Sequence, residues 1–314
     1  MKHPTILSRC TRLLGGAALV AGLAASGAGV AAADGTADDI EVTTYSSSAQ
    51  SDAHDHWTSA RMEAALPADE LAPEGAPVTA DVEKADPVTV KGRSAQAPGK
   101  NEKAAPAKDT VGKVFFTQGG VDYVCSGNAV ASANGVTVAT AGHCVNDAGT
   151  WATNWVFVPG YDHGQARYGT WAATELVSTD QWVGQEDINY DVAFATVAPE
   201  SGSATLEDAV GTTSIAFNRE RGAHYTAYGY PAAAPFDGQS LESCAGTASD
   251  DTLGGTLSQG ISCDMTGGSS GGPWFLDDGA QNSVNSFGYT GQKNVMYGPY
   301  YGADAQAAYE QAAG

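Results

Sequence analysis

One sequence feature of residues 110–314 most constrains the fold. In this part of the chain, short apolar runs alternate with turn residues. The runs are rich in Val, Tyr, Phe and Thr, and Gly, Asn and Asp stand between them. Strands at such regular spacing are typical of an all-β sandwich or barrel. We expect strands at Val111–Thr117, Val121–Val130, Val136–Ala141, Trp155–Pro159, Asp191–Val197 and Tyr225–Tyr230. The length suits one β unit or a pair of small barrels.

The chain begins with the pattern of a secretory signal peptide. Lys2 and Arg12 give a positive start, and residues 13–30 are apolar and uncharged. Ala31–Ala33 then supplies a small-residue cleavage pattern. A membrane anchor is the alternative because the run is long enough to span a bilayer, but its Gly and Ala content favours cleavage. We therefore predict a signal peptide at residues 1–33 and a secreted, extracellular protein that no longer contacts the membrane.

Export decides how the cysteines are interpreted, because disulfides persist in oxidising compartments. Cys10 lies within the predicted signal peptide, which leaves an even number of cysteines: Cys125, Cys144, Cys244 and Cys263. Of the possible pairings we favour Cys125–Cys144 and Cys244–Cys263, since they close loops of equal span that are worth roughly 3 kcal/mol each. A zinc site of Cys125, His143 and Cys144 is the alternative, but it needs free thiolates outside the cell.

Residues 34–109 form a zone of different composition. They are rich in Ala, Pro, Asp, Glu and Lys, and Tyr45 and Trp57 are their only aromatic residues. Such a segment buries too little apolar surface for a strong core, so we expect it to be largely disordered, with a linker over residues 93–109. We interpret the zone as a pro-segment that is removed when a zymogen matures. A flexible tail that stays attached is the alternative.

The net charge of −21 is strongly acidic. It argues against nucleic acid as a partner, because phosphate binding needs a basic face. It promotes solubility and could attract basic polypeptides, but it does not name a substrate. Two acidic pairs, Asp250–Asp251 and Asp277–Asp278, could bind calcium, although solvated turns are the favoured interpretation. We expect no cofactor and no metal.

A serine within a glycine-rich turn is the strongest indication of chemistry. Residues 267–273 read Gly-Gly-Ser-Ser-Gly-Gly-Pro. Glycine adopts backbone conformations that other residues avoid, so backbone N–H groups can converge on one point, as an oxyanion hole requires. We predict that Ser270 is a nucleophile and that the N–H groups of Gly268 and Ser270 form the oxyanion hole. A Gly/Ser loop without chemistry is the alternative for the motif taken alone.

A base and an orienting acid accompany this serine. His143 ends an apolar strand in Ala-Gly-His-Cys. A serine hydroxyl needs an adjacent base, and histidine titrates near the working pH. Asp191 begins an alternating strand and fits a buried acid that orients the imidazole, whereas Asp187 has the setting of an exposed loop. We therefore predict His143, Asp191 and Ser270 as a catalytic triad.

Together the motifs resemble the trypsin/chymotrypsin-like serine peptidases in their secreted bacterial branches. Thr-Ala-Gly-His-Cys at 140–144, Asp-Val-Ala at 191–193 and Gly-Ser-Ser-Gly-Gly-Pro at 268–273 occur in this family's order. The resemblance implies an all-β fold of two six-stranded antiparallel β-barrels with the active site between them. It also implies a closing helix at Ala303–Ala313, where Ala305, Ala308, Tyr309 and Ala312 share one face.

The resemblance also suggests substrate contacts and contains one departure. Ser286 and Gly288 match the family's strand that pairs with the substrate backbone. Asp264 matches the acid that binds Arg or Lys in trypsin-type enzymes, although an Asp in this setting could instead hydrogen-bond within its loop. Ser269 stands where the family commonly has Asp, so we do not expect the amino-terminal ion pair that activates the animal enzymes. The pattern is similar to the glutamyl-endopeptidase-like branches, but Asn285 replaces their specificity histidine.

Three functions follow from this sequence, and a secreted serine endopeptidase that acts on polypeptides through an acyl-enzyme, as a monomer, is favoured. A non-catalytic peptide-binding module is a weaker candidate, because such modules usually lack a triad residue. An esterase would use the same triad, so the sequence does not separate it from a peptidase.

Overall fold

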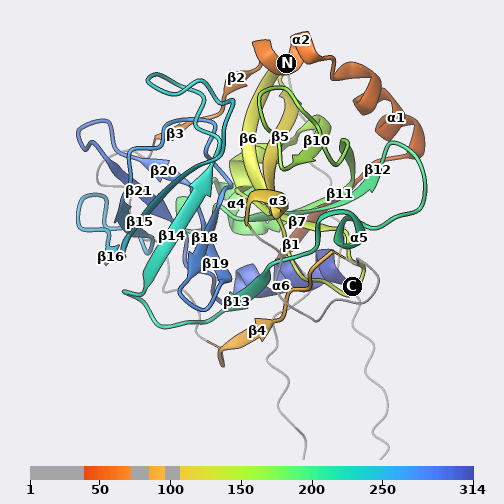
Figure 1. Ribbon diagram of the computed structural model, residues 1–314. Coiled ribbons are helices and arrows are strands. Elements are labelled where there is room, and N and C mark those ends of the chain that lie inside the picture. Colours follow the sequence, from red (N-terminus) through yellow and green to blue (C-terminus); the bar gives the residue numbers. More distant parts are fainter. Residues whose placement is uncertain (1–38, 72–84, 96–106) are drawn as a thin grey trace, which may run out of the picture. The chain divides into compact units, whose positions relative to one another are not determined.

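The computed structural model describes residues 39–71, 85–95 and 107–314, and this part of the chain is mostly β (Figure 1). The predicted signal peptide lies outside the described residues. Within those residues, no helix is long and apolar enough to cross a membrane.

Six strands close into a barrel whose antiparallel order is β5-β6-β7-β12-β11-β10, with β10 pairing back to β5. Their bounds are β5 (Val111–Gln118), β6 (Val121–Ala129), β7 (Thr137–Thr140), β10 (Thr153–Pro159), β11 (Trp171–Thr179) and β12 (Ala193–Pro199). Val114, Phe157 and Phe194 are fully buried in the core of this barrel. The apolar runs predicted for this half therefore become the walls of one closed unit.

Short elements connect these strands and carry part of the site. They are the turn η1 (Gly142–Cys144), the hairpin strands β8 (Asn146–Asp147) and β9 (Thr150–Trp151), helix α4 (Asp180–Gln185), the turn η2 (Ile188–Tyr190) and helix α5 (Leu206–Val210). Helix α5 begins with a capping box, in which Thr205 and Asp208 each accept a hydrogen bond from the other's backbone N–H.

Two further sheets make up the C-terminal half. The larger has the order β15 (Glu242–Thr247), β14 (His224–Gly229), β18 (Pro273–Leu276), β19 (Ala280–Val284), β13 (Ser214–Phe217) and β4 (Val88–Val90). The smaller has the order β16 (Ser249–Asp250), β17 (Gln259–Ser262), β21 (Val295–Gly298), β20 (Phe287–Gly288) and β3 (Glu70–Leu71). Tyr225, Ile261 and Trp274 pack in the core of this half. Strand pairing thus closes a single ring in the first half and leaves two sheets in the second.

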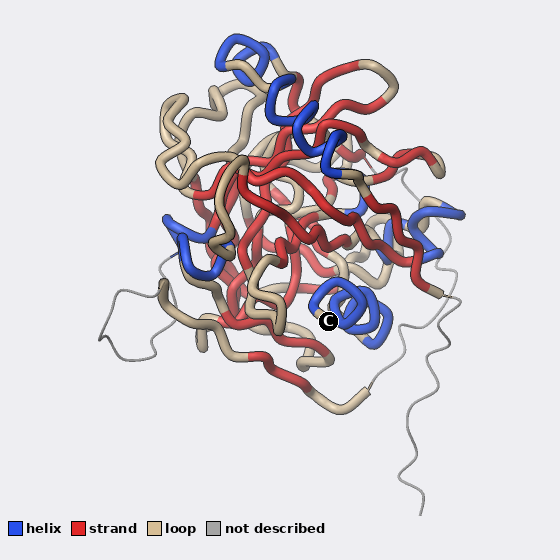
Figure 2. The backbone as a smooth tube through the Cα atoms, turned by 90° about the vertical axis from the view of Figure 1, so that its right-hand side faces the viewer, coloured by secondary structure: helices blue, strands red, loops and turns tan. Residues whose placement is uncertain are grey.

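Helix α6 (Ala303–Ala313) occupies the range expected from its helical spacing and packs on the first barrel (Figure 2). The Tyr309 ring contacts Phe194 and Phe217. Its hydroxyl donates a hydrogen bond of 2.6 Å to the carbonyl of Ala131. The predicted apolar face of the helix is therefore buried against strands far away in sequence.

The described parts of residues 34–109 are ordered, contrary to the expectation of a largely disordered zone. They contain β1 (Ile40–Thr44), α1 (Ser47–His56), α2 (Ser59–Ala64), β2 (Leu66–Pro67) and α3 (Ala107–Thr110), besides β3 and β4. Strand β1 pairs with β11. Trp57 is buried against Phe115 and donates to the carbonyl of Asn154 at 2.5 Å. The zone lacks a core of its own, but it buries its few apolar side chains against the barrel.

Two disulfides cross-link the chain. Cys125 is bonded to Cys144, and Cys244 to Cys263. This is the pairing favoured by the equal loop spans. The first bond joins β6 to the turn η1, and the second joins β15 to the residue after β17.

Candidate active site

His143 lies in the turn η1 that follows β7. A Cβ at Gly142 would meet the Trp182 ring at 2.7 Å, so only glycine fits beside that ring. The next residue, Cys144, is tied to β6 by its disulfide, and its carbonyl accepts a hydrogen bond of 3.0 Å from the Trp155 indole. The turn is therefore fixed on both sides of the imidazole.

Asp191 is fully buried and accepts three hydrogen bonds. Its Oδ1 accepts from the backbone N–H of His143 at 2.8 Å, and its Oδ2 lies 2.8 Å from His143 Nδ1 and 2.5 Å from the Ser286 hydroxyl. Burial alone would raise the pKa of Asp191, but attraction to His143 and these hydrogen bonds hold it below its ordinary value. An ionised carboxylate only accepts, so Nδ1 carries the imidazole proton and Nε2 is the basic nitrogen.

Ser270 lies in the loop that joins β17 to β18, and two glycines shape this loop. Gly268 has φ +93° and Gly271 has φ +78°, values that side-chain-bearing residues rarely adopt. A Cβ at Gly271 would also meet the Ser126 carbonyl oxygen at 2.4 Å. Substitution at either glycine would displace the loop that presents Ser270.

Ser126 and Asn285 hold this loop from outside, and neither role was predicted from the sequence. The N–H of Ser126 donates to the Ser270 carbonyl at 2.7 Å, and its hydroxyl donates to the Gly268 carbonyl at 2.9 Å. Asn285 donates to the Ser269 carbonyl at 2.9 Å. The Ser269 hydroxyl itself donates to the carbonyl of Thr266 at 2.8 Å. The residue that replaces the family's Asp is therefore satisfied within its own loop.

Two cavities meet at this site. A cavity of about 600 Å³ is lined by Ser270, Ser286, Gly288 and the exposed Asp264, together with Lys293. A smaller cavity of about 260 Å³ contains His143. It is also lined by Phe116, Gln118, Tyr123, Asp147, Trp182 and Glu186. Five predicted site residues thus line two adjoining cavities, whereas Asp191 and Gly268 line neither, and Asp69 of the N-terminal zone lines both.

The alternative metal sites do not suit metal chemistry. Cys125, His143 and Cys144 bring possible ligand atoms within 4.8 Å of one another, but both sulfurs belong to a disulfide and offer no thiolate. Asp251 accepts hydrogen bonds from Leu253, Gly254, Thr256 and Tyr289. Asp250, Asp277 and Asp278 pair with Arg221, His224 and Arg219 respectively. These carboxylates therefore already stabilise turns and ion pairs.

Comparison with known proteins decides the family. Residues 125–281 match the trypsin-like peptidase domain. Protease Anisep from Arthrobacter nicotinovorans is 49% identical, covers 67% of this chain and 98% of its own, and superposes with a TM-score of 0.64. The chain belongs to the trypsin-like serine peptidases. The family indicated by the three motifs is thereby confirmed.

Other solved structures resemble this peptidase to different degrees. The thermostable serine protease AL20, from an extremophilic microorganism, is 52% identical, covers 66% of this chain and 99% of its own, and has a TM-score of 0.63. A Glu endopeptidase is 21% identical, covers 71% of this chain and 97% of its own, and has a TM-score of 0.53, so it shares the fold alone. No curated protein matches the chain.

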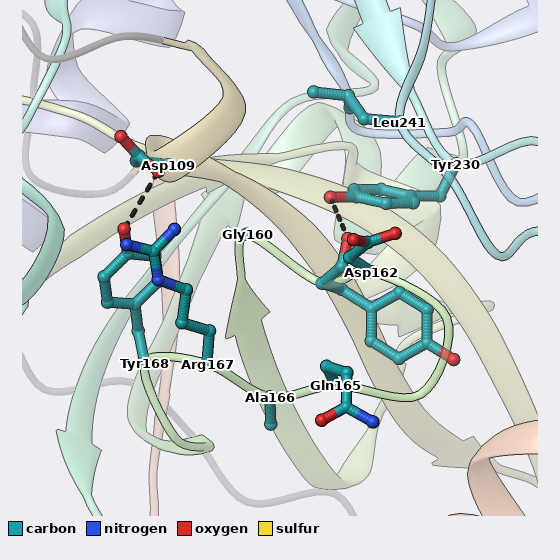
Figure 3. Close-up of a pocket in the computed structure, with 10 residues that line it drawn as sticks. Asp109, Gly160, Asp162, Gln165, Ala166, Arg167, Tyr168, Tyr230 and Leu241 are labelled. Atoms are coloured by element: carbon teal, nitrogen blue, oxygen red, sulfur yellow. Dashed lines mark hydrogen bonds between the residues drawn. The ribbon is translucent and has the colours of Figure 1, made fainter.

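This peptidase has a further cavity of about 560 Å³ that shares no lining residue with the two at the site (Figure 3). In it the Tyr168 hydroxyl donates to Asp109 at 2.9 Å, and the Tyr230 hydroxyl donates to the Tyr161 carbonyl at 2.9 Å. These bonds tie the short helix α3 and the chain after β14 to the loop between β10 and β11. We assign this cavity a structural role.

Proposed function

We propose that this peptidase is an exported endopeptidase that hydrolyses polypeptides through an acyl-enzyme on Ser270. The observation that supports it is the chain of hydrogen bonds from Ser286 through Asp191 to His143, beside the glycine-shaped loop that carries Ser270. Such an arrangement supplies a nucleophile, a base and an orienting acid. Export rests on the predicted signal peptide, and a zymogen on the position of residues 34–109 before the catalytic part. We further propose that the enzyme acts as a monomer, without membrane or nucleic-acid partners.

In the proposed reaction the Ser270 Oγ attacks the scissile carbonyl while its proton passes to His143 Nε2. The carbonyl oxygen takes the negative charge and is stabilised by the N–H groups of Gly268 and Ser270. The intermediate collapses, the C–N bond breaks, and the leaving amine takes the proton from Nε2. Water then hydrolyses the acyl-enzyme by the same transfers. Asp191 stays ionised and stabilises the imidazolium, in keeping with its lowered pKa.

Substrate backbone would pair with Ser286–Gly288, at the wall of the larger cavity. The two C-terminal sheets would form the second barrel of the family fold, and the site would lie between it and the closed first barrel. A cleft between two barrels would let an extended chain lie across the nucleophile, as an endopeptidase requires.

Covalent labelling by a fluorophosphonate tests the nucleophile. We expect the full chain, after limited proteolysis has removed its N-terminal zone, to be labelled once and to hydrolyse peptides. Ser270→Ala should abolish both. Ser269→Ala is the matched control, because it removes the neighbouring hydroxyl and should retain labelling. Equal labelling of the Ser270→Ala chain and the parent chain would contradict the proposal.

We also propose that Asp264 favours a basic side chain in the larger cavity. It is exposed on the wall of this cavity, where its negative charge would attract the side chain of Lys or Arg. Asp264→Asn should lower cleavage after Lys and Arg by about tenfold, the effect of a 1.4 kcal/mol loss, and leave cleavage after uncharged residues unchanged. A peptide-library profile measures this, with Asp277→Asn, which changes an exposed carboxylate outside this cavity, as the control. An unaltered profile would remove Asp264 from the specificity site.

A further inference from the structure

A segment of the chain itself lies across the site. Strand β2 pairs in parallel with β6, with Leu66 opposite Tyr123 and Pro67 opposite Val124. Strand β3 then pairs in parallel with β20, with Phe287 opposite Glu70 and Gly288 opposite Leu71. Residues 66–71 therefore run from the first barrel to the wall on which we place the substrate backbone (Figure 1).

Ala68, at the middle of this segment, binds one of the two donors of the proposed oxyanion hole. Its N–H donates to the Val124 carbonyl at 3.0 Å. Its own carbonyl accepts a hydrogen bond of 2.8 Å from the N–H of Gly268, the donor that would stabilise the oxyanion. Ala68 is only 8% exposed. A peptide carbonyl of the chain thus takes up one of the two N–H groups expected to bind the substrate carbonyl oxygen.

Asp69, the next residue of the segment, also lies at the site. It lines the cavity of His143 and the cavity of Ser270. A Cβ placed on Gly267 would meet the Cβ of Asp69 at 2.9 Å, so the segment packs directly on the nucleophile loop. Burial raises the pKa of Asp69, while attraction to His143 opposes that rise. Asp69 therefore forms part of the wall of both cavities while the segment is bound.

The direction of the segment is opposite to the direction that hydrolysis requires. The leaving amine must face His143, because Nε2 hands it a proton. His143 shares its cavity with Phe116 and Tyr123, at the β5–β6 side, whereas Ser286–Gly288 line the other cavity. A productive substrate therefore runs from β20 towards β6 and is antiparallel to both strands. Residues 66–71 run from β6 to β20, parallel to both.

This reversed direction would protect the segment from cleavage. If Ser270 attacked the Ala68 carbonyl, the amine to be expelled would be the nitrogen of Asp69. The chain that follows this nitrogen is held on β20, whose residues line the cavity of Ser270 and not the cavity of His143. Without proton transfer to that nitrogen the C–N bond does not break, and the carbonyl re-forms by expelling Ser270.

We propose that Leu66–Leu71 is an inhibitory strand, a peptide ligand that the chain supplies to its own substrate cleft in the reversed and uncleavable direction. The proposal deepens the peptidase function and rests on it. It assigns the cleft a second kind of occupant besides substrate.

The first experiment measures how fast a fluorophosphonate labels Ser270 in the intact full chain, with chain integrity checked by intact mass. Ala68→Pro removes the N–H that bonds to Val124, so labelling should become about tenfold faster, the effect of one backbone hydrogen bond. Ala60→Pro is the matched control, because it makes the same change in the first turn of α2, where proline is tolerated. It should be labelled at the parent rate.

Two outcomes overturn the inhibitory strand in different ways. Equal and rapid labelling of the intact parent, Ala60→Pro and Ala68→Pro chains would show that residues 66–71 do not block the cleft, while the peptidase function stands. Absence of labelling in every chain, including one freed of its N-terminal zone by limited proteolysis, would remove the peptidase function and the inhibitory strand together.

A second measurement tests the direction on the unaltered chain. Mass spectrometry of the incubated parent and of Ser270→Ala maps which bonds the enzyme cuts. We expect the bond between Ala68 and Asp69 to remain intact for as long as the segment stays bound. A product that begins at Asp69 in the parent and is missing from Ser270→Ala would mean that the segment binds as a substrate, and the reversed assignment would be wrong.

Discussion

At the scale of single residues, buried charges in this protein differ in how well they are compensated. Asp191 is fully buried but accepts three hydrogen bonds and faces an imidazole. Lys113, on β5, is 2% exposed, and its Nζ donates to the Gly238 carbonyl at 3.0 Å. The Nζ also lies 4.7 Å from the Tyr161 ring centroid. A carbonyl and an aromatic face compensate an ammonium group less than a carboxylate would, so Lys113 is a candidate for pH-dependent stability.

We predict that Lys113 makes the protein more stable as the pH rises above 8. Burial lowers the pKa of Lys113 to about 8 from its ordinary 10.5. Between these values the unfolded chain binds more protons than the folded chain, so the free energy of unfolding rises with pH. The full effect is about 3 kcal/mol. Urea unfolding of Ser270→Ala chains from pH 7.5 to 9.5 should therefore show a rise in the parent that Lys113→Met lacks.

The control for this prediction is the exposed Lys293, replaced by Met in the same Ser270→Ala background. Lys293→Met should follow the parent's pH curve. If the free energy of unfolding of Lys113→Met has the same pH dependence as that of the parent, the buried amine does not cause the rise in stability with pH. The absolute stability of the variant is not the readout, because it also loses the bond to Gly238.

At the scale of elements, local sequence patterns predicted the barrel strands. The elements that were not predicted depend on contacts with residues far away in the sequence. The runs at Val111–Thr117 and Trp155–Pro159 became β5 and β10, because short β-rich runs between turn residues have few other structures to adopt. Strand β1 and helix α1 were missed because their partners lie in β10 and β11, more than a hundred residues away. The parallel pairing of β13 with β19 is likewise invisible in either strand alone.

The residues of the candidate site fall into the same two groups, those with a local motif and those whose role depends on long-range contacts. His143 and Asp191 could be predicted because their chemistry restricts the residue type and each follows a recognisable motif. Ser126 could not, because an ordinary serine within a strand gains its role only when folding brings it to a loop 144 residues further along the chain. Ala68 and Asp69 carry no motif at all. Their importance comes from backbone hydrogen bonds and position in the cleft, which composition does not record.

At the scale of the whole molecule, the N-terminal zone contacts the catalytic part through β4, which pairs with β13, and at two further places that bear on the cleft. One is the inhibitory strand at Leu66–Leu71. The other is an anchor formed by β1, α1 and Trp57, which docks on β10 and β11. The two contacts support each other because a short stretch of chain joins them. The anchor therefore holds the inhibitory strand near the cleft at a high effective concentration. Weakening the anchor should therefore release the inhibitory strand even though no residue of the cleft has changed.

We predict that Trp57→Ala accelerates labelling of Ser270 in the intact chain by about tenfold or more. Loss of a buried Trp side chain costs about 3–5 kcal/mol, and part of this cost is transmitted to the strand. Trp57→Phe should lie between parent and Ala, since it keeps an aromatic ring beside Phe115 and loses only the indole bond to Asn154. After the zone has been removed by proteolysis, all three chains have the same sequence, so their peptide hydrolysis must coincide.

This comparison separates anchoring from damage to the catalytic part. Faster labelling of intact Trp57→Ala together with equal activity of the processed forms can arise only through the N-terminal zone. If Ala68→Pro is labelled faster and Trp57→Ala is not, the strand binds the cleft without help from the anchor. The coupling between the two contacts would then be wrong, and docking of β1 and α1 would serve the stability of the barrel alone.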